Sequence, residues 1–102
     1  MSNSTFSVLI YPKAENDLFD IKEYFEKTLK TSATPLFEKF YSHIERLEVN
    51  PLIHPLVKDT YLNQLGYRMI PIDNFLVFYI VNDKEVQIHR FLYGKRNYLL
   101  FL

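Results

Sequence analysis

The chain has 102 residues and a formal net charge of zero at pH 7, and 48% of its residues are hydrophobic. This length allows one packed core and is too short for two, so we expect a single domain over residues 1–102. Because the sequence has no cysteine and only three scattered histidines, disulfides and thiolate metal sites are excluded, and we expect no metal and no cofactor.

The N-terminus is polar and lacks the basic start and long apolar run of a signal peptide. The sequence also lacks an apolar stretch of about 18 residues, the length that a membrane-spanning helix requires. We therefore expect a soluble cytoplasmic protein with no membrane contact.

The first predicted elements are a strand over residues 6–11 and a long amphipathic helix. Pro12 ends the strand and is tolerated in the first turn of a helix. From Ala14 to Leu29 apolar residues recur at helical spacing, so the helix is expected over about residues 12–30. Four acids of this segment are expected on its solvated face: Glu15, Asp17, Asp20 and Glu23.

A second helix is predicted over about residues 35–49, with Thr34 as its cap and Pro35 at its first position. It ends at Asn50-Pro51. Because the loop between the two helices is short, we expect them to form an antiparallel hairpin. The connection that follows is expected to be a solvated loop and contains Lys58, Asp59 and Tyr61.

The second half of the chain has three runs of strand composition at hairpin spacing, residues 66–72, 75–81 and 85–93. The middle run is almost entirely apolar and predicts a central strand buried on both faces, whereas Pro71 belongs at a sheet edge. These elements predict an α+β fold, in which a helical hairpin packs on one face of an antiparallel sheet. Residues 97–102 are expected either to pack back as a helical turn or to wait for a partner.

Charge is unevenly distributed along the chain. Residues 1–50 carry eight acids and six Lys or Arg, and residues 51–102 carry four acids and six Lys or Arg, which gives net charges of −2 and +2. After Glu85 the sequence has no acid and three cations, Arg90, Lys95 and Arg96. The C-terminal third therefore indicates a cationic face, with ordinary solvated charges as the alternative.

Three segments resemble a known family: Gly66-Tyr67-Arg68, NFLVFY at residues 74–79 and YGKRN at residues 93–97. In this order, over about residues 6–98, they resemble the RelE/ParE superfamily of toxins from type II toxin–antitoxin systems, and its ParE-like branch most. The resemblance implies plasmid stabilisation and growth inhibition by a toxin that a cognate antitoxin neutralises. Members similar to ParE poison DNA gyrase, whereas members similar to RelE or YoeB cleave messenger RNA in the ribosome.

The nuclease hypothesis requires phosphate-binding cations and groups that transfer protons. The cationic positions of RelE-like members fall on Arg68 and Arg96, which keep the charge, and on Ile70 and Phe75, which do not. Their late tyrosine falls near Leu102, which is not a tyrosine. This poor match disfavours RelE-style cleavage, although whether the protein is an enzyme stays open.

His89 is a further candidate for proton transfer, because strand alternation would place it on one side with Gln87, Phe91 and Tyr93. A packed or solvent-facing histidine is the alternative. Tyr98 or Tyr93 could replace the late tyrosine. The candidate catalytic residues of an endoribonuclease are therefore Arg68, His89, Arg96 and Tyr98.

Gyrase poisoning requires only a binding surface, for which aromatic and arginine side chains are typical anchors. Five candidate target-binding residues lie close together in the sequence: Arg90, Tyr93, Lys95, Arg96 and Tyr98. The alternative is structural, with Arg90 lying beside the helices and the tyrosines completing the core. Arg68 is expected to pair with an acid of the first helix, and Gly94 is expected at positive φ.

The partners implied by the resemblance are an antitoxin and either DNA gyrase or the ribosome with its messenger RNA. An amphipathic antitoxin segment is expected to cover the aromatic face of the sheet or the groove beside the helical hairpin. Free toxin would then expose apolar area and aggregate or form a homodimer. A third hypothesis is a degenerate toxin that only binds its antitoxin and acts as a co-repressor.

Overall fold

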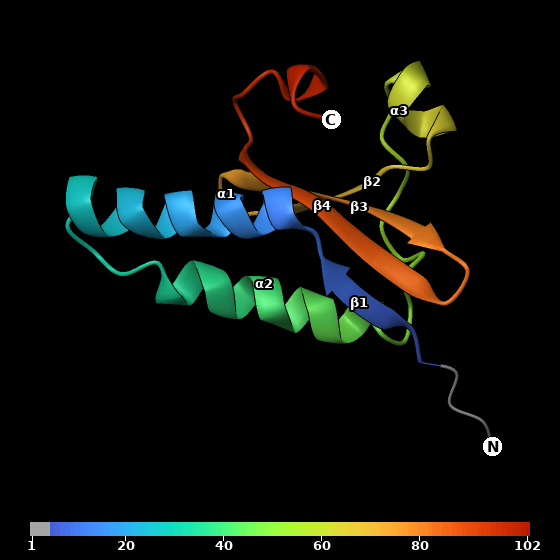
Figure 1. Ribbon diagram of the computed structural model, residues 1–102, viewed down its shortest axis with the longest axis horizontal. Helices are drawn as coiled ribbons and strands as arrows, with labels where there is room; N and C mark the ends of the chain where they lie inside the picture. The colour runs from blue at the N-terminus through green and yellow to red at the C-terminus, as the bar shows by residue number, and fades with distance from the viewer. Residues whose placement is uncertain (1–4) are drawn as a thin grey trace.

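Residues 5–102 are described by a computed structural model, in which four strands form one sheet in the order β1-β4-β3-β2 (Figure 1). Their bounds are Ser7–Ile10 for β1, Arg68–Ile72 for β2, Phe75–Asn82 for β3 and Glu85–Tyr93 for β4. The three C-terminal strands are antiparallel, as predicted. β1, however, pairs in parallel with β4, so the expectation of an entirely antiparallel sheet is wrong. The helical connection between β1 and the later strands is long enough for such a crossover.

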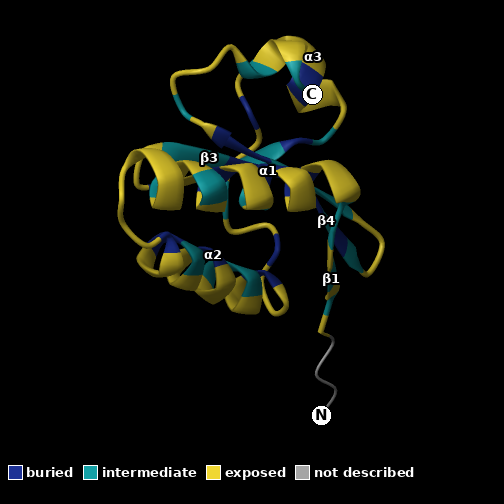
Figure 2. Ribbon diagram, turned by 60° about the vertical axis from the view of Figure 1, so that its left-hand side comes forward, coloured by how far each residue is buried: buried dark blue, intermediate teal, exposed yellow. Residues whose placement is uncertain are grey.

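Two helices separate β1 from the rest of the sheet. α1 spans Pro12–Glu23 and continues as one π turn over Tyr24–Thr28, and α2 spans Thr34–Leu47. The prediction that Thr34 caps this helix is wrong, because Thr34 is its first residue and the N-cap is Ala33, which has no side-chain capping bond. The backbone N–H of Thr34 donates to the Ser32 hydroxyl at 3.1 Å. The predicted helical hairpin is confirmed, and its outward surfaces are exposed (Figure 2).

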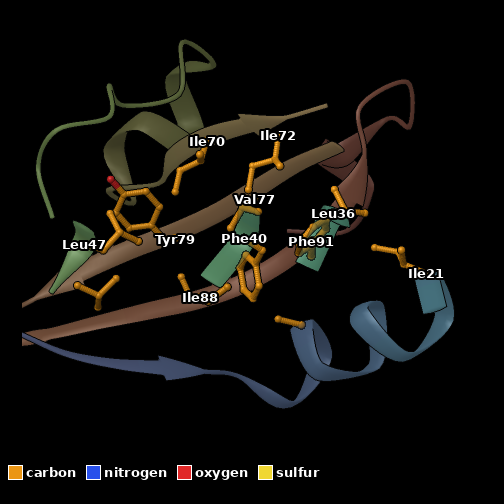
Figure 3. Packing of buried hydrophobic residues seen from close by; sticks show 12 residues of the cluster. Ile21, Leu36, Phe40, Leu47, Ile70, Ile72, Val77, Tyr79, Ile88 and Phe91 are labelled. Atoms are coloured by element: carbon orange, nitrogen blue, oxygen red, sulfur yellow. The ribbon is translucent and has the colours of Figure 1, made fainter. Parts of the chain in front are cut away.

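The helix-covered face of the sheet holds the larger core. Phe40 of α2 packs edge-to-face on Phe91 of β4, with ring centroids 5.0 Å apart. Val77 and Tyr79 of β3 lie in the same cluster (Figure 3). The neighbouring Phe78 is fully buried in a second cluster on the opposite face, which confirms that β3 is buried on both sides.

The opposite face is covered by two short segments, which lie on the far side of the sheet from α2 (Figure 1). α3 spans Thr60–Gln64, and a 3₁₀ turn spans Tyr98–Leu100 near the C-terminal end. The Asp59 carboxylate caps α3 by accepting a hydrogen bond of 3.0 Å from the Leu62 N–H. The predicted loop at this position therefore contains a helix, which is too short to produce a periodic sequence pattern.

A β-bulge in β4 reverses the alternation of its side chains. The register passes from Tyr79–Ile88 to Phe78–Arg90, so His89 is the extra residue of the bulge. Ile88 and Phe91 both face the helices as a result, whereas His89 lies on the opposite face, bonded to Tyr67. The prediction that His89 and Phe91 share one side is therefore wrong.

Two glycines have different reasons for lacking a side chain. Gly66, before β2, has φ of 89°, a conformation that favours glycine. At Gly94 the requirement is space, because an added Cβ would lie 3.1 Å from the Asn74 carbonyl oxygen. The expectation of positive φ at Gly94 is wrong, since Gly66 is the glycine with that conformation among the described residues. Within residues 5–102 no helix is both long and apolar enough to span a membrane.

Candidate functional site

A nearly buried ion pair between Asp17 of α1 and Arg90 of β4 anchors the candidate site. Nε and Nη2 of Arg90 donate to the two carboxylate oxygens of Asp17 at 2.7 and 2.8 Å. This two-point geometry is the strong form of an arginine–carboxylate contact. The hydrogen bonds raise the pKa of Arg90 above its usual value, so the guanidinium stays charged.

The end of β1 explains why an acid of α1 is buried. The pairing of β1 with β4 ends with a backbone hydrogen bond from the Tyr11 N–H to the Ile88 carbonyl. β4 continues to Tyr93 without β1 beside it. At this edge of β4 the Asp17 carboxylate, and not a strand carbonyl, accepts a hydrogen bond of 2.9 Å from the Phe91 N–H. The prediction that Asp17 lies on the solvated face of the helix is therefore wrong.

Arg68 has other partners than those predicted. Its guanidinium donates to the carbonyl of His54 at 2.7 Å and of Leu52 at 3.5 Å, so it fastens the connection after α2 to the edge strand β2. The arginine that pairs with an acid of the first helix is Arg90. The pairing expected for Arg68 is thus wrong.

The C-terminal segment packs back on the protein, the first of the two alternatives predicted for it. Nη1 of Arg90 donates to the Phe101 carbonyl at 2.9 Å. The Phe101 ring also lies under the Arg96 guanidinium, with 4.3 Å from Cζ to the ring centroid. Tyr98 packs against Phe78 of β3, with centroids 4.9 Å apart.

A groove of about 540 Å³ lies between the end of α1, with its π turn, and the adjoining ends of β3 and β4. Its walls are mostly aromatic and aliphatic, and three charged side chains also line it: Asp17, which is paired with Arg90, Asp20 and Arg96. Tyr24, Leu29 and Tyr93 line this groove and are roughly half exposed. We call it the aromatic groove; the residues used below are Asp20, Tyr24, Leu29, Phe75, Tyr93 and Arg96.

The structure brings together three of the five candidate target-binding residues. Tyr93 and Arg96 line the aromatic groove, and Lys95 is exposed in the same turn, residues 93–97. Arg90 and Tyr98 are engaged within the protein instead, with Asp17 and Phe78 respectively.

The four candidate catalytic residues do not converge. His89 stacks on Tyr11, and both of its ring nitrogens are engaged. The Gln87 amide nitrogen donates to Glu85, so its oxygen accepts from the His89 Nε2–H at 3.2 Å, and the Tyr67 hydroxyl donates to Nδ1 at 2.9 Å. Burial lowers the pKa of His89 and favours this neutral form. A structural histidine accounts for every one of these contacts.

The positions compared with the nuclease cations also fail to form a cationic surface. Ile70 is 1% exposed, and both Ile70 and Phe75 pack in the helix-covered cluster. On the other face, the second cluster is built around Phe78 and Leu92. Within residues 5–102 no group of three or more His, Cys, Asp or Glu residues is placed to hold a metal ion.

Sequence reasoning missed two residues of this region, Asp17 and Phe101. Asp17 follows Ala14 by three positions and precedes Ile21 by four, a spacing that places all three on one helix face. That spacing was a usable signal, since Ala14 and Ile21 are buried. For Phe101 no such signal exists, because its contacts with Arg90 and Arg96 depend on how the chain turns after β4.

The comparisons with known proteins agree with this fold. A family model described as "ParE toxin of type II toxin-antitoxin system, parDE" matches residues 8–98. Among 11 matching chains of solved structures, one from the "Chromosomal ParDE TA system from P. aeruginosa" is similar with a TM-score of 0.69. Its sequence identity is 19%, and the match covers 90% of this chain and 99% of that one. No curated protein matches. Because the family model covers most of the sequence, the chain belongs to the ParE toxin family of type II toxin–antitoxin systems.

Proposed function

We propose that this toxin arrests growth in the cytoplasm by binding and poisoning DNA gyrase. The observation that carries the proposal is the turn of residues 93–97, where Tyr93, Lys95 and Arg96 are exposed together beside the aromatic groove. Aromatic and arginine side chains are the usual anchors of protein–protein recognition, and trapping an enzyme requires no chemistry from the toxin.

The arrangement of the candidate catalytic residues supports binding over RNA cleavage. A nuclease must hold a base, an acid and phosphate-binding cations around one reacting atom. Arg68 is fastened to the connection after α2, and His89 uses both ring nitrogens within the protein. Neither Arg68 nor His89 lines the aromatic groove, which is where Arg96 lies.

We also infer that the cognate antitoxin inserts an amphipathic segment into the aromatic groove. Of the two surfaces expected for the antitoxin, the aromatic face of the sheet is covered by α3 and the C-terminal turn. The groove beside the helical hairpin is open and has charges of both signs, from Asp20 and Arg96. A segment with a large apolar side chain between a basic and an acidic residue complements it.

Isotope incorporation in cells tests the target. Thymidine and methionine are supplied during the first minutes after the toxin is induced without its antitoxin. We expect thymidine incorporation to stop first while methionine incorporation continues, and Arg96→Ala to relieve this arrest. A prior collapse of methionine incorporation would assign the toxin to the ribosome instead. If neither changes and growth continues, the chain acts only as an antitoxin-binding co-repressor.

A further inference from the structure

The C-terminal turn carries an aromatic ring that contacts two arginines. We infer that Phe101 is a positioning residue: its ring holds the Arg96 guanidinium in the orientation used for target binding, and its carbonyl is held by Arg90. This inference rests on the proposed role of residues 93–97 as the target-binding turn. It assigns the binding function to Arg96 and a supporting function to Phe101, Arg90 and Asp17.

The contact between Arg96 and Phe101 is the first step. The Arg96 Cζ lies 4.3 Å from the Phe101 ring centroid, well within the range of a cation–π interaction. The ion pairs found within residues 5–102 do not include Arg96. Its position is therefore set by an uncharged ring, and its donors remain available for a carboxylate or phosphate of the target.

Arg90 fixes Phe101 in turn. Its Nη1 donates to the Phe101 carbonyl at 2.9 Å, and its Cζ lies 5.5 Å from the ring centroid. Arg90 has little freedom itself, because Asp17 binds it at two points and only 13% of its side chain is exposed. The orientation of Arg96 thus depends on a series of contacts from Asp17 through Arg90 and Phe101.

A simpler role for Phe101 is to fill space, since it packs against the second hydrophobic cluster. Two substitutions of Phe101 distinguish the positioning role from the space-filling role. Phe101→Leu keeps an apolar side chain of similar bulk and removes the aromatic face, whereas Phe101→Tyr keeps the face. Leu100, in the same turn, is 76% exposed, so Leu100→Ala is a matched control.

Two readouts measure the effect on the purified full-length chain. The first is the Arg96 Nε–H resonance, which the aromatic ring shifts upfield by its ring current; we expect this shift to disappear in Phe101→Leu and persist in Phe101→Tyr. The second is the toxin concentration that inhibits supercoiling by gyrase by half. We expect Phe101→Leu to raise it about two- to fivefold, the range of an exposed cation–π contact, and Phe101→Tyr to leave it unchanged.

A double variant separates positioning from stability. In the Arg96→Ala background Phe101→Leu should cause no further loss of inhibition, because the residue that it positions is absent. Equal losses in both backgrounds, or an unchanged Arg96 resonance in Phe101→Leu, would overturn the inference. If the wild-type chain does not inhibit gyrase, the proposed function fails, while the resonance still reports on the Arg96 contact. Thermal unfolding of each variant identifies any that is misfolded.

Discussion

The nearly buried carboxylate of Asp17 serves both a guanidinium and a backbone N–H, so its loss leaves two groups without their partner. We expect Asp17→Ala to lower the free energy of unfolding by about 3–5 kcal/mol, the usual effect of removing one partner of a buried ion pair. Urea denaturation measures this change. Glu15→Ala, an exposed acid in the same helix, is the control and should change it by less than about 0.5 kcal/mol. Similar midpoints for both variants would contradict a stabilising role for the ion pair.

We expect the stability to depend on pH through neutral histidines, of which His43 and His54 form a pair and His89 contributes in the same direction. The rings of His43 and His54 lie edge-to-face with centroids 5.5 Å apart, and burial, with the nearby charge of Arg46, lowers the pKa of both. Because these pKa values lie below 6.5, the value for the unfolded chain, the unfolded state binds more protons as the pH falls through 6.5. Stability is therefore expected to decrease on acidification.

Thermal unfolding between about pH 7 and about pH 5 checks this dependence, since the carboxylates still keep their charge over most of that range. The midpoint should fall in the wild-type chain, and it should fall less in the double variant His43→Gln, His54→Gln. The same fall in both proteins would mean that other groups control the acid sensitivity.

At the scale of the element, the π turn that ends α1 presents Tyr24 to the aromatic groove. We expect Tyr24→Ala to weaken antitoxin binding about tenfold or more, as the loss of an aromatic anchor does. Titration calorimetry with the purified antitoxin measures the affinity. Phe19→Ala is the matched control, because Phe19 belongs to α1, is 60% exposed and is not among the groove residues. Equal losses in both variants would place the antitoxin elsewhere on α1.

Elements with long apolar patterns could be predicted from the sequence, and short ones could not. The run at residues 75–81 is apolar on both faces, so its place at the centre of the sheet follows from burial alone. α3 has five residues and depends on one capping bond from Asp59, which no periodicity reveals. The bulge at His89 depends on how β3 and β4 pair over their whole length, which is a property of the sheet.

The candidate site, too, could be predicted from the sequence only in part. Tyr93, Lys95 and Arg96 could be predicted as a group, because residues in one tight turn remain close in any fold. That Arg90 pairs with Asp17, 73 positions away, depends on where β1 ends relative to β4. Contacts of this kind follow from the assembled sheet and not from local spacing.

The whole molecule covers both faces of its sheet yet leaves much apolar surface exposed. Besides the aromatic groove, one stretch from the end of α2 to the end of α3 has several exposed large side chains: Val49, Leu52, Ile53, Leu56, Tyr61 and Leu65. Exposed apolar side chains favour association where they gather on a surface. We expect the free toxin to bind a hydrophobic dye and to self-associate as its concentration rises.

Light scattering and dye fluorescence measure these properties. Addition of the antitoxin should reduce both signals if it covers the aromatic groove, as we propose. A free toxin that stays monomeric and leaves the dye dark would contradict this expectation.

The parallel pairing of the first strand with the last also fixes the order of events during synthesis. Ser7–Ile10 pairs with residues 85–88, so the first strand emerges from the ribosome long before its partner exists. The hairpins among β2, β3 and β4 join near neighbours in the chain, whereas the pairing of β1 closes a loop of most of the protein and is therefore slow. We therefore expect the aromatic groove to be absent until the last strand has been made, because β4 supplies Phe91 and Tyr93 to its lining.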